Sequence, residues 1–123
     1  MSIPAEHYAA RRAALGSALA EAGVEAWIAY GDDRQFAGAD HVRYLSSLQP
    51  HFEGALVVGG PETTDIVSGP ETVGYAEFAC EGAGIDRILP IAELSHPGLA
   101  YRSIALTDGA AHLAAALRGA RRV

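Results

Sequence analysis

The chain has 123 residues, which is enough for one compact domain with a buried core. Half of the residues are hydrophobic and 20% are charged, the ordinary balance of a soluble globular protein. The formal net charge is −6, and all 9 basic residues are arginine. So few cations argue against a nucleic-acid-binding face, and the lack of lysine excludes Schiff-base chemistry and a P-loop lysine within this chain.

The sequence also bears on the compartment. A single cysteine, Cys80, excludes an intrachain disulfide, and without asparagine there is no N-glycosylation site. The first residues lack the basic and apolar regions of a signal peptide. No apolar run reaches the roughly 20 residues that a membrane-spanning helix needs. We therefore expect a cytoplasmic protein that binds neither membranes nor nucleic acids.

The N-terminal segment predicts an amphipathic helix over residues 5–22, ended by Gly23. Arg11 and Arg12 are expected to flank its apolar stripe, where their aliphatic stems cover apolar surface. The stripe itself consists of Tyr8, Leu15, Leu19 and Ala22, which recur at helical spacing.

The next segments predict a strand and a loop. Residues 26–30 form a short apolar run with β-forming residues, which predicts a buried strand. Residues 31–40 are polar and contain glycine, which favours a loop. Residues 41–48 leave a helical turn and an irregular segment equally open.

A hairpin and a helix follow. Residues 54–59 and 63–68 predict two strands, and the Gly-Gly-Pro-Glu sequence between them is typical of a turn. Pro70 and Glu71 carry the start signals of a helix that we expect to run to about Cys80, where nearby glycines end it.

The last third predicts a strand, a loop and a helix. Residues 85–91 read as a strand that Pro90 ends or confines to an edge, and residues 92–103 as mostly loop. Thr107 or Asp108 is expected to cap the final helix, which runs to about residue 118. Its expected inward side chains are Ala110, Leu113, Ala114 and Leu117.

Residues 121–123 resemble the start of a further strand, which suggests the boundary of a cloned segment or a shortened gene. The order of the elements predicts an α/β domain in which helices cover a mixed sheet.

Neither the histidines nor the carboxylates form a recognisable site. The acidic cluster of Asp32, Asp33 and Asp40 follows a predicted strand, where turn formation is the commoner role than cation binding. Cys80 falls late in a helix among small residues and is expected to be a buried structural thiol. No pair has the spacing of a metal motif among the five histidines His7, His41, His51, His96 and His112.

Glycine and serine motifs are equally uninformative. The glycines at 59–60 join two predicted strands, and those at 82 and 84 lead into a strand, so neither pair has the context of a phosphate loop. The nucleophile elbow Gly-x-Ser-x-Gly does not occur. The residues alone thus indicate a domain without a catalytic constellation.

Several short segments, in the right order, resemble the N-terminal domains of the creatinase/prolidase/aminopeptidase P group. Tyr8 and Arg11 match the Tyr-x-x-Arg of that group's first helix. Residues 30–37 and 50–56 match its loop and hairpin regions. Tyr44-Leu45 matches the start of a Tyr-Leu-Thr-Gly-Phe motif, from which the chain departs at the next residues, Ser-Ser-Leu. Residues 69–75 resemble a Gly-x-Glu…Gly-Tyr stretch found in one branch.

The resemblance implies that residues 1–123 form a single N-terminal domain, a three-layer α/β fold of ribonuclease H-like architecture. Such domains are non-catalytic: they support dimerisation and lend residues to an active-site rim. The catalytic pita-bread domain is not in this chain. In the peptidases it binds a dinuclear divalent metal such as manganese, whereas creatinase-like members use no metal. This chain itself is expected to hold no cofactor.

The implied partners are the protein's own C-terminal catalytic domain, a second copy in a homodimer, and a peptide or a small amidino substrate. An arginine at the rim would clamp a substrate carboxylate, and aromatic rings would shape a small pocket. The alternative is that Phe36, Tyr44 and Phe52 pack in the core or against the hairpin. The rim candidates are Arg34, Phe36, Arg43, Tyr44, His51 and Phe52.

Two other functions remain open. The domain could be a free-standing α/β module for binding or oligomerisation, without a hydrolase partner domain. It could also be a small enzyme that uses Asp32, Asp33 and His41.

Overall fold

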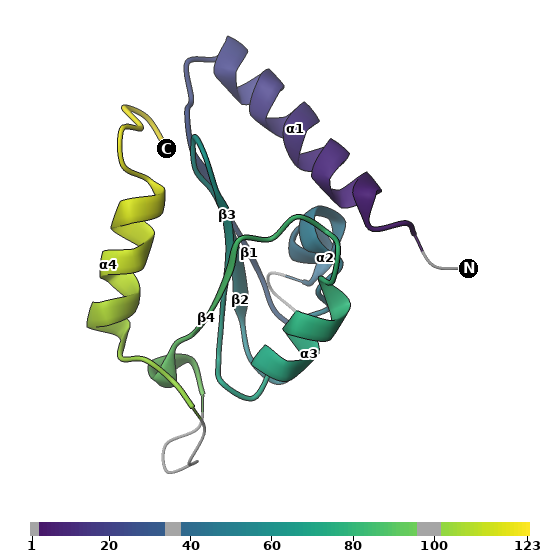
Figure 1. Cartoon of the computed structure of the whole chain (residues 1–123), viewed down its shortest axis with the longest axis vertical. Helices are drawn as coiled ribbons and strands as arrows, with labels where there is room; N and C mark the ends of the chain where they lie inside the picture. Colours follow the sequence, from purple (N-terminus) through teal and green to yellow (C-terminus); the bar gives the residue numbers. More distant parts are fainter. Residues whose placement is uncertain (1–2, 34–37, 96–101) are drawn as a thin grey trace.

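The computed structural model describes residues 3–33, 38–95 and 102–123 (Figure 1). The elements follow one another in the predicted order, and the segment left open after the first strand is a helix. Their bounds are α1 Glu6–Glu21, β1 Trp27–Gly31, α2 Asp40–Ser46, β2 Ala55–Gly59, β3 Thr64–Ser68, α3 Val73–Ala79, β4 Arg87–Pro90, the 3₁₀ helix η1 Ala92–Leu94 and α4 Leu106–Ala116.

The strands form one mixed, open sheet in the order β1-β2-β3-β4. Strand β2 runs antiparallel to both β1 and β3, and β4 runs parallel to β3. The amide of Gly60 donates to the carbonyl of Thr63 at 2.9 Å, which closes the predicted hairpin turn. Pro90 lies in the edge strand β4, where its missing N–H costs no ladder bond on the outer side.

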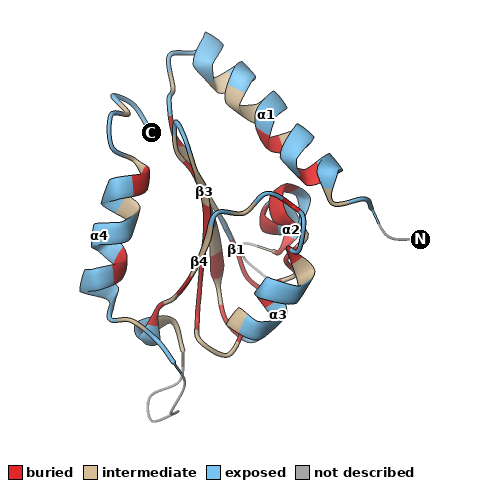
Figure 2. Ribbon diagram, in the orientation of Figure 1, coloured by how far each residue is buried: buried red, intermediate tan, exposed pale blue. Residues whose placement is uncertain are grey.

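Helices cover both faces of the sheet, with α1, α2 and α3 on one face and α4 on the other (Figure 1). Many residues of the sheet between these layers are buried (Figure 2). Under α1 to α3 the core includes Val42, Val57 and Ile66, and under α4 it includes Val58 and Val67. Neighbouring residues of a strand thus serve opposite cores, as the pleat requires. The α/β class with a helix-covered mixed sheet is confirmed.

The first strand is less buried than the sequence predicted. Trp27 and Ala29 pack against the core beneath α1 to α3, whereas Ile28 and Tyr30 are exposed. The difference arises because β1 is an edge strand and because α4 packs on side chains of β2, β3 and β4. The apolar run of residues 26–30 therefore forms a strand whose side chains alternate between partly buried and exposed.

The outer edge of β1 meets other parts of the chain at both ends. The amides of Glu25 and Ala26 donate to the carbonyl of Arg122, at 3.0 and 3.3 Å. The amide of Asp32 donates to the carbonyl of Gly38 at 3.0 Å. Residues 121–123 lie beside the start of β1 and are not a strand, contrary to the expectation.

Arg12 was expected at the side of the α1 stripe, but it is buried. Its guanidinium donates to the carbonyls of Leu45 at 2.8 Å, Ala83 at 2.5 Å and Gly84 at 2.8 Å. These bonds join α1 to α2 and to the turn after α3. Burial lowers the pKa of the Arg12 guanidinium. Ala22, which was assigned to the stripe, is exposed.

Helix α3 begins later than predicted, at Val73. The carboxylate of Glu53 accepts the amide of Thr72 at 3.0 Å and its hydroxyl at 2.8 Å, so a residue of the loop before β2 supplies the cap. Gly69 lies so close to this carboxylate that a Cβ there would collide with it. The sequence placed the start of the helix at Pro70, which is too early. The bonds that define the observed start come from Glu53, which is remote in sequence.

Helix α4 also begins at a different residue, Leu106, whose amide donates to Oε2 of Glu93 at 2.8 Å. Neither Thr107 nor Asp108 is therefore the cap. The expected inward face is half right, since Leu113 and Leu117 pack against the core beneath α4. Ala110 and Ala114 are exposed, and the buried positions of this helix are Gly109 and Ala116.

Candidate functional site

The described rim candidates form two groups on α2 and on the segment that leads from it to β2. Arg43 and Tyr44 belong to α2, and His51 and Phe52 belong to the following loop. All four are exposed. Arg34 and Phe36 lie outside the described residues, so their predicted roles are neither supported nor opposed.

Arg43 and Tyr44 line an open hollow of about 1000 Å³ between α1, α2 and α3. Tyr8 and Arg11 of α1 and Tyr75 of α3 contribute to the same hollow. Since His51 and Phe52 are not among its lining residues, the structure gathers only half of the described candidates in this place.

Arg11 holds the ring of Tyr44 in position. Its guanidinium carbon lies 4.3 Å from the centroid of the Tyr44 ring and 5.2 Å from that of the Tyr8 ring. Its Nη1 also donates to the backbone carbonyl of Tyr44 at 3.1 Å. A cation over an aromatic face is attractive, and more so where water is partly excluded.

Sequence reasoning did not select Arg11 as a site residue. The available signal was its spacing from Tyr8, because residues three apart on a helix are neighbours on its surface. The contact with Tyr44 involves a residue 33 positions away, which no local pattern reveals.

The second group is organised by Asp33. Its Oδ2 accepts the amide of Phe52 at 2.9 Å and lies 3.5 Å from Nδ1 of His51. The rings of His51 and Phe52 lie 3.8 Å apart at a tilt of 51°. Phe52 has a φ of 64°, a left-handed conformation that is uncommon for a bulky residue. The hydrogen bond that the Phe52 amide donates to Asp33 helps to hold the loop in this conformation.

Neither Tyr44 nor Phe52 is a core residue. Their side chains are 56% and 67% exposed, so the alternative that they pack in the core is wrong. Phe36, the third residue of that alternative, lies outside the described residues.

The neighbouring acids shape the loops. The Tyr30 hydroxyl donates to Oδ2 of Asp32 at 2.9 Å, and Asp33 bonds to the backbone of Phe52. This arrangement supports the turn interpretation of the Asp-Asp pair. Within residues 3–33, 38–95 and 102–123, no group of three or more His, Cys, Asp or Glu side chains could hold a metal ion. The enzyme hypothesis on Asp32, Asp33 and His41 thus finds no grouping to support it.

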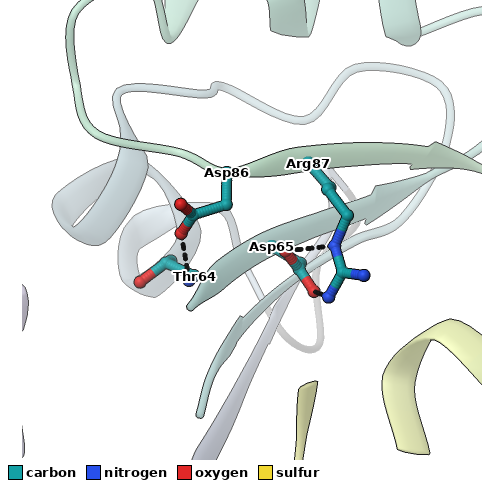
Figure 3. Close-up of polar contacts among 4 residues, drawn as sticks. All are labelled: Thr64, Asp65, Asp86 and Arg87. Carbon is teal, nitrogen blue, oxygen red and sulfur yellow. Dashed lines mark hydrogen bonds and ion pairs between the residues drawn. The ribbon is translucent and has the colours of Figure 1, made fainter. Parts of the chain in front are cut away.

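A further charged cluster ties β3 to β4 (Figure 3). Arg87 donates from Nε to Oδ1 of Asp65 at 3.0 Å and from Nη2 to Oδ2 at 2.6 Å. Asp65 is wholly buried, and this hydrogen bonding raises the pKa of Arg87. Next to them, Asp86 accepts the amide of Thr64 at 2.7 Å. The cluster fixes the alignment of the two parallel strands.

Cys80 is buried, as predicted for a structural thiol. Burial raises its pKa from an ordinary value of 9.0 to about 11, so the thiol stays protonated at neutral pH. In that form it is a poor nucleophile, and the structure assigns it a packing role.

Comparison of the chain with protein-family models, with curated proteins and with solved structures gave no match in any of the three. The likeness to creatinase/prolidase N-terminal domains therefore stays a prediction. None of the described helices is long and apolar enough to cross a membrane.

Proposed function

We propose that the chain is a non-catalytic N-terminal domain of an Xaa-Pro peptidase or creatinase-like metallohydrolase. In this proposal the domain takes part in dimerisation and contributes to the active-site rim of the full protein. The observation that carries it is the exposure of Arg43, Tyr44, His51 and Phe52 along one segment, the segment in which the motif resemblance is densest.

The geometry supports a rim role better for the first pair than for the second. Tyr44 is held by Arg11 above an open hollow, and Arg43 lies beside it with its guanidinium free to approach a carboxylate from another domain. His51 and Phe52 form a separate, exposed pair of rings, and the amide of Phe52 donates a hydrogen bond to Asp33. A preorganised aromatic and an arginine suit recognition of a small peptide or amidino substrate.

The ribonuclease H-like architecture is part of the same proposal. Helices on both faces of a mixed sheet are compatible with it. The metal of the peptidases would be bound by the catalytic domain, whose ligands this chain does not contain.

Two measurements test the proposal. Purified chain supplied with Mn²⁺ or Co²⁺ is expected to leave an Xaa-Pro dipeptide uncleaved, and robust metal-dependent hydrolysis would overturn the non-catalytic assignment. Sequencing the gene beyond the codon for Val123 is expected to reveal the two Asp, one His and two Glu of the catalytic domain in the family's order.

If that gene product is a hydrolase, the rim assignment has its own test. Arg43→Ala is expected to raise KM with little change in kcat, because a carboxylate clamp at the rim binds ground and transition states alike. Arg118→Glu, in the turn that follows α4, is the control, since Arg118 lines a separate hollow beside the β2–β3 turn and not the hollow that Arg43 lines. An unchanged KM in the Arg43 variant would remove this residue from the rim.

A free-standing binding or oligomerisation module is the second candidate. It is favoured by the exposure of Tyr44, Tyr75 and Phe78, since adjoining exposed aromatic side chains mark an interaction site whether or not a hydrolase domain exists. A stop codon directly after Val123 in the natural gene would select this candidate over the first.

A further inference from the structure

Four large apolar side chains lie together on the outer side of the helices that cover one face of the sheet. We call them the aromatic surface, formed by Ile3, Tyr44, Tyr75 and Phe78. All four are exposed, and Phe78 is 77% exposed. Isolated exposed apolar residues are normal, whereas an adjoining group marks a place of contact with another molecule.

The continuity of this surface follows from two adjoining hollows. The hollow of about 1000 Å³ is lined by Ile3, Tyr44 and Tyr75, among others. A smaller one of about 310 Å³ is lined by Ile3, Tyr75 and Phe78, among others. Because Ile3 and Tyr75 line both, the four side chains belong to one surface.

The surface is rigid at two points. Arg11 fixes the ring of Tyr44, and the backbone of Tyr75 and Phe78 belongs to α3, whose cap is Glu53. Tyr75 and Phe78 are three residues apart and share the outer side of that helix, while Ala76 and Cys80 turn inward. Preorganised side chains lose less conformational entropy on binding.

The charges on the two sides of this surface are opposite. Arg11 and Arg43 line the same hollow as Tyr44, with Asp40 as its carboxylate, and we call this the basic side. Beyond Phe78 lie Glu77 and Glu81, which are both exposed and form the acidic side.

Opposite charges on the two sides make the surface complementary to itself. A two-fold axis passing near Tyr75 places the basic side of one copy against the acidic side of the other, and the reverse. Such an isologous contact buries both sets of aromatic rings at its centre, where binding energy is concentrated.

We propose that the aromatic surface is the site at which a second copy of this chain docks, forming a symmetric homodimer. Each molecule carries a net charge of −6, so two copies repel one another over most approaches. The basic side of this surface offsets that repulsion locally and fixes the orientation of approach.

The proposal names the surface for the dimerisation part of the proposed function, but it rests on the exposed residues and not on the hydrolase assignment. A monomeric chain would overturn the dimer and leave the hydrolase assignment untouched. If the gene encodes no catalytic domain, the hydrolase assignment is overturned and the dimer proposal is left untouched.

Sedimentation equilibrium tests the proposal. A small interface implies weak association, so the chain is examined from about 10 μM to about 1 mM. We expect a species of twice the 12.8 kDa mass of the chain. Phe78→Ser is expected to raise the dissociation constant by about 30-fold, as for a residue at the centre of an interface.

Charge reversal identifies the arrangement. In the proposed contact Arg43→Glu sets an acidic residue against the acidic side of the other copy, and Glu81→Arg sets a basic residue against its basic side. Each variant alone is therefore expected to associate about tenfold more weakly. An equimolar mixture of the two restores both pairs of opposite charges and is expected to form a heterodimer. Only a contact in which the two sides face one another across copies predicts this recovery.

Arg118→Glu, in the turn that follows α4, is the matched control, and it is expected to leave association unchanged because Arg118 lines a separate hollow beside the β2–β3 turn. Far-UV circular dichroism checks that each variant is folded. A wild-type chain that stays monomeric up to about 1 mM overturns the proposal. So does a dimer that is indifferent to Phe78→Ser, or a mixture of the two charge variants that stays apart.

Discussion

The two helix layers are held to the molecule by different means. On one face, charged side chains join α1, α2 and α3 to one another, through Arg12 and Glu53. On the other face, α4 packs through Leu113 and Leu117 and approaches the sheet closely at Gly109. Removing a buried, hydrogen-bonded charged group strongly destabilises the fold, because its partners are left unpaired. The apolar contacts of a helix can be lost one after another. We therefore expect α4 to open locally while the other layer unfolds with the whole domain.

The largest expected effect comes from Arg12, at the centre of the first layer. Arg12→Met keeps the aliphatic stem but leaves the carbonyls of Leu45, Ala83 and Gly84 without their donor. The free energy of unfolding is expected to fall by about 3–5 kcal/mol. Urea denaturation measures this change. Arg11→Met is the control, and a loss as small for Arg12 as for Arg11 would refute the contrast between the layers.

The cap of α3 is the next target. Glu53→Ala removes the acceptor of the Thr72 amide and hydroxyl, and a loss of about 2 kcal/mol is expected. Glu53→Gln keeps one acceptor oxygen and should lose less. Gly69→Ala should resemble Glu53→Ala, because the new Cβ displaces the same carboxylate. If Gly69→Ala leaves the thermal midpoint unchanged, the close approach of Gly69 to the Glu53 carboxylate does not contribute to stability.

Alkaline pH tests the same layer through Cys80. Its pKa is about 11 in the folded chain and ordinarily 9.0, so between these values the unfolded state releases its proton first. Stability is therefore fully present below about pH 9 and falls as pH rises, by up to about 2 kcal/mol near pH 11. The midpoints of urea denaturation between pH 8 and 10.5 measure the loss of stability that ionisation of Cys80 causes. The Cys80→Ala variant should show a flatter profile, and identical profiles would contradict the buried, protonated thiol.

The smallest effect is expected in the second layer. Glu93→Ala removes the acceptor of the Leu106 amide and should lower the free energy of unfolding by about 1 kcal/mol. Hydrogen exchange should show faster opening of α4 with little change in α1. Glu93→Gln serves as the control that retains an acceptor. Equal acceleration in both helices would mean that the two layers open together.

The sequence allowed those parts of the fold to be predicted that depend on nearby residues. The hairpin of β2 and β3 follows from turn residues between two β-forming runs, and α1 follows from its apolar spacing. What could not be predicted depends on residues far apart in the chain. Arg12 turns inward because carbonyls 33 and 71 positions away require a donor. The pairing of Asp65 with Arg87, 22 positions away, likewise requires the parallel alignment of β3 and β4.

The candidate site shows the same division. The segment that carries Arg43 and Tyr44 was selected from its sequence, and both side chains are exposed there. Arg11, which positions Tyr44, was missed because it belongs to another helix. The separation of His51 and Phe52 from the hollow could not be predicted either, since the Phe52 amide donates to Asp33, a residue 19 positions away.

The bonds at the ends of β1 have a consequence for how this sheet meets its surroundings. Alternate peptide groups of a strand point the same way, so the amides of Ile28 and Tyr30 share the outward direction of those of Ala26 and Asp32. The two flanking amides are already taken by Arg122 and Gly38. Only a very short stretch of this edge is open as a template for a foreign strand, and short edges resist runaway pairing. An intruding strand could therefore pair with β1 through only a few backbone groups, although residues 26–30 are an apolar run.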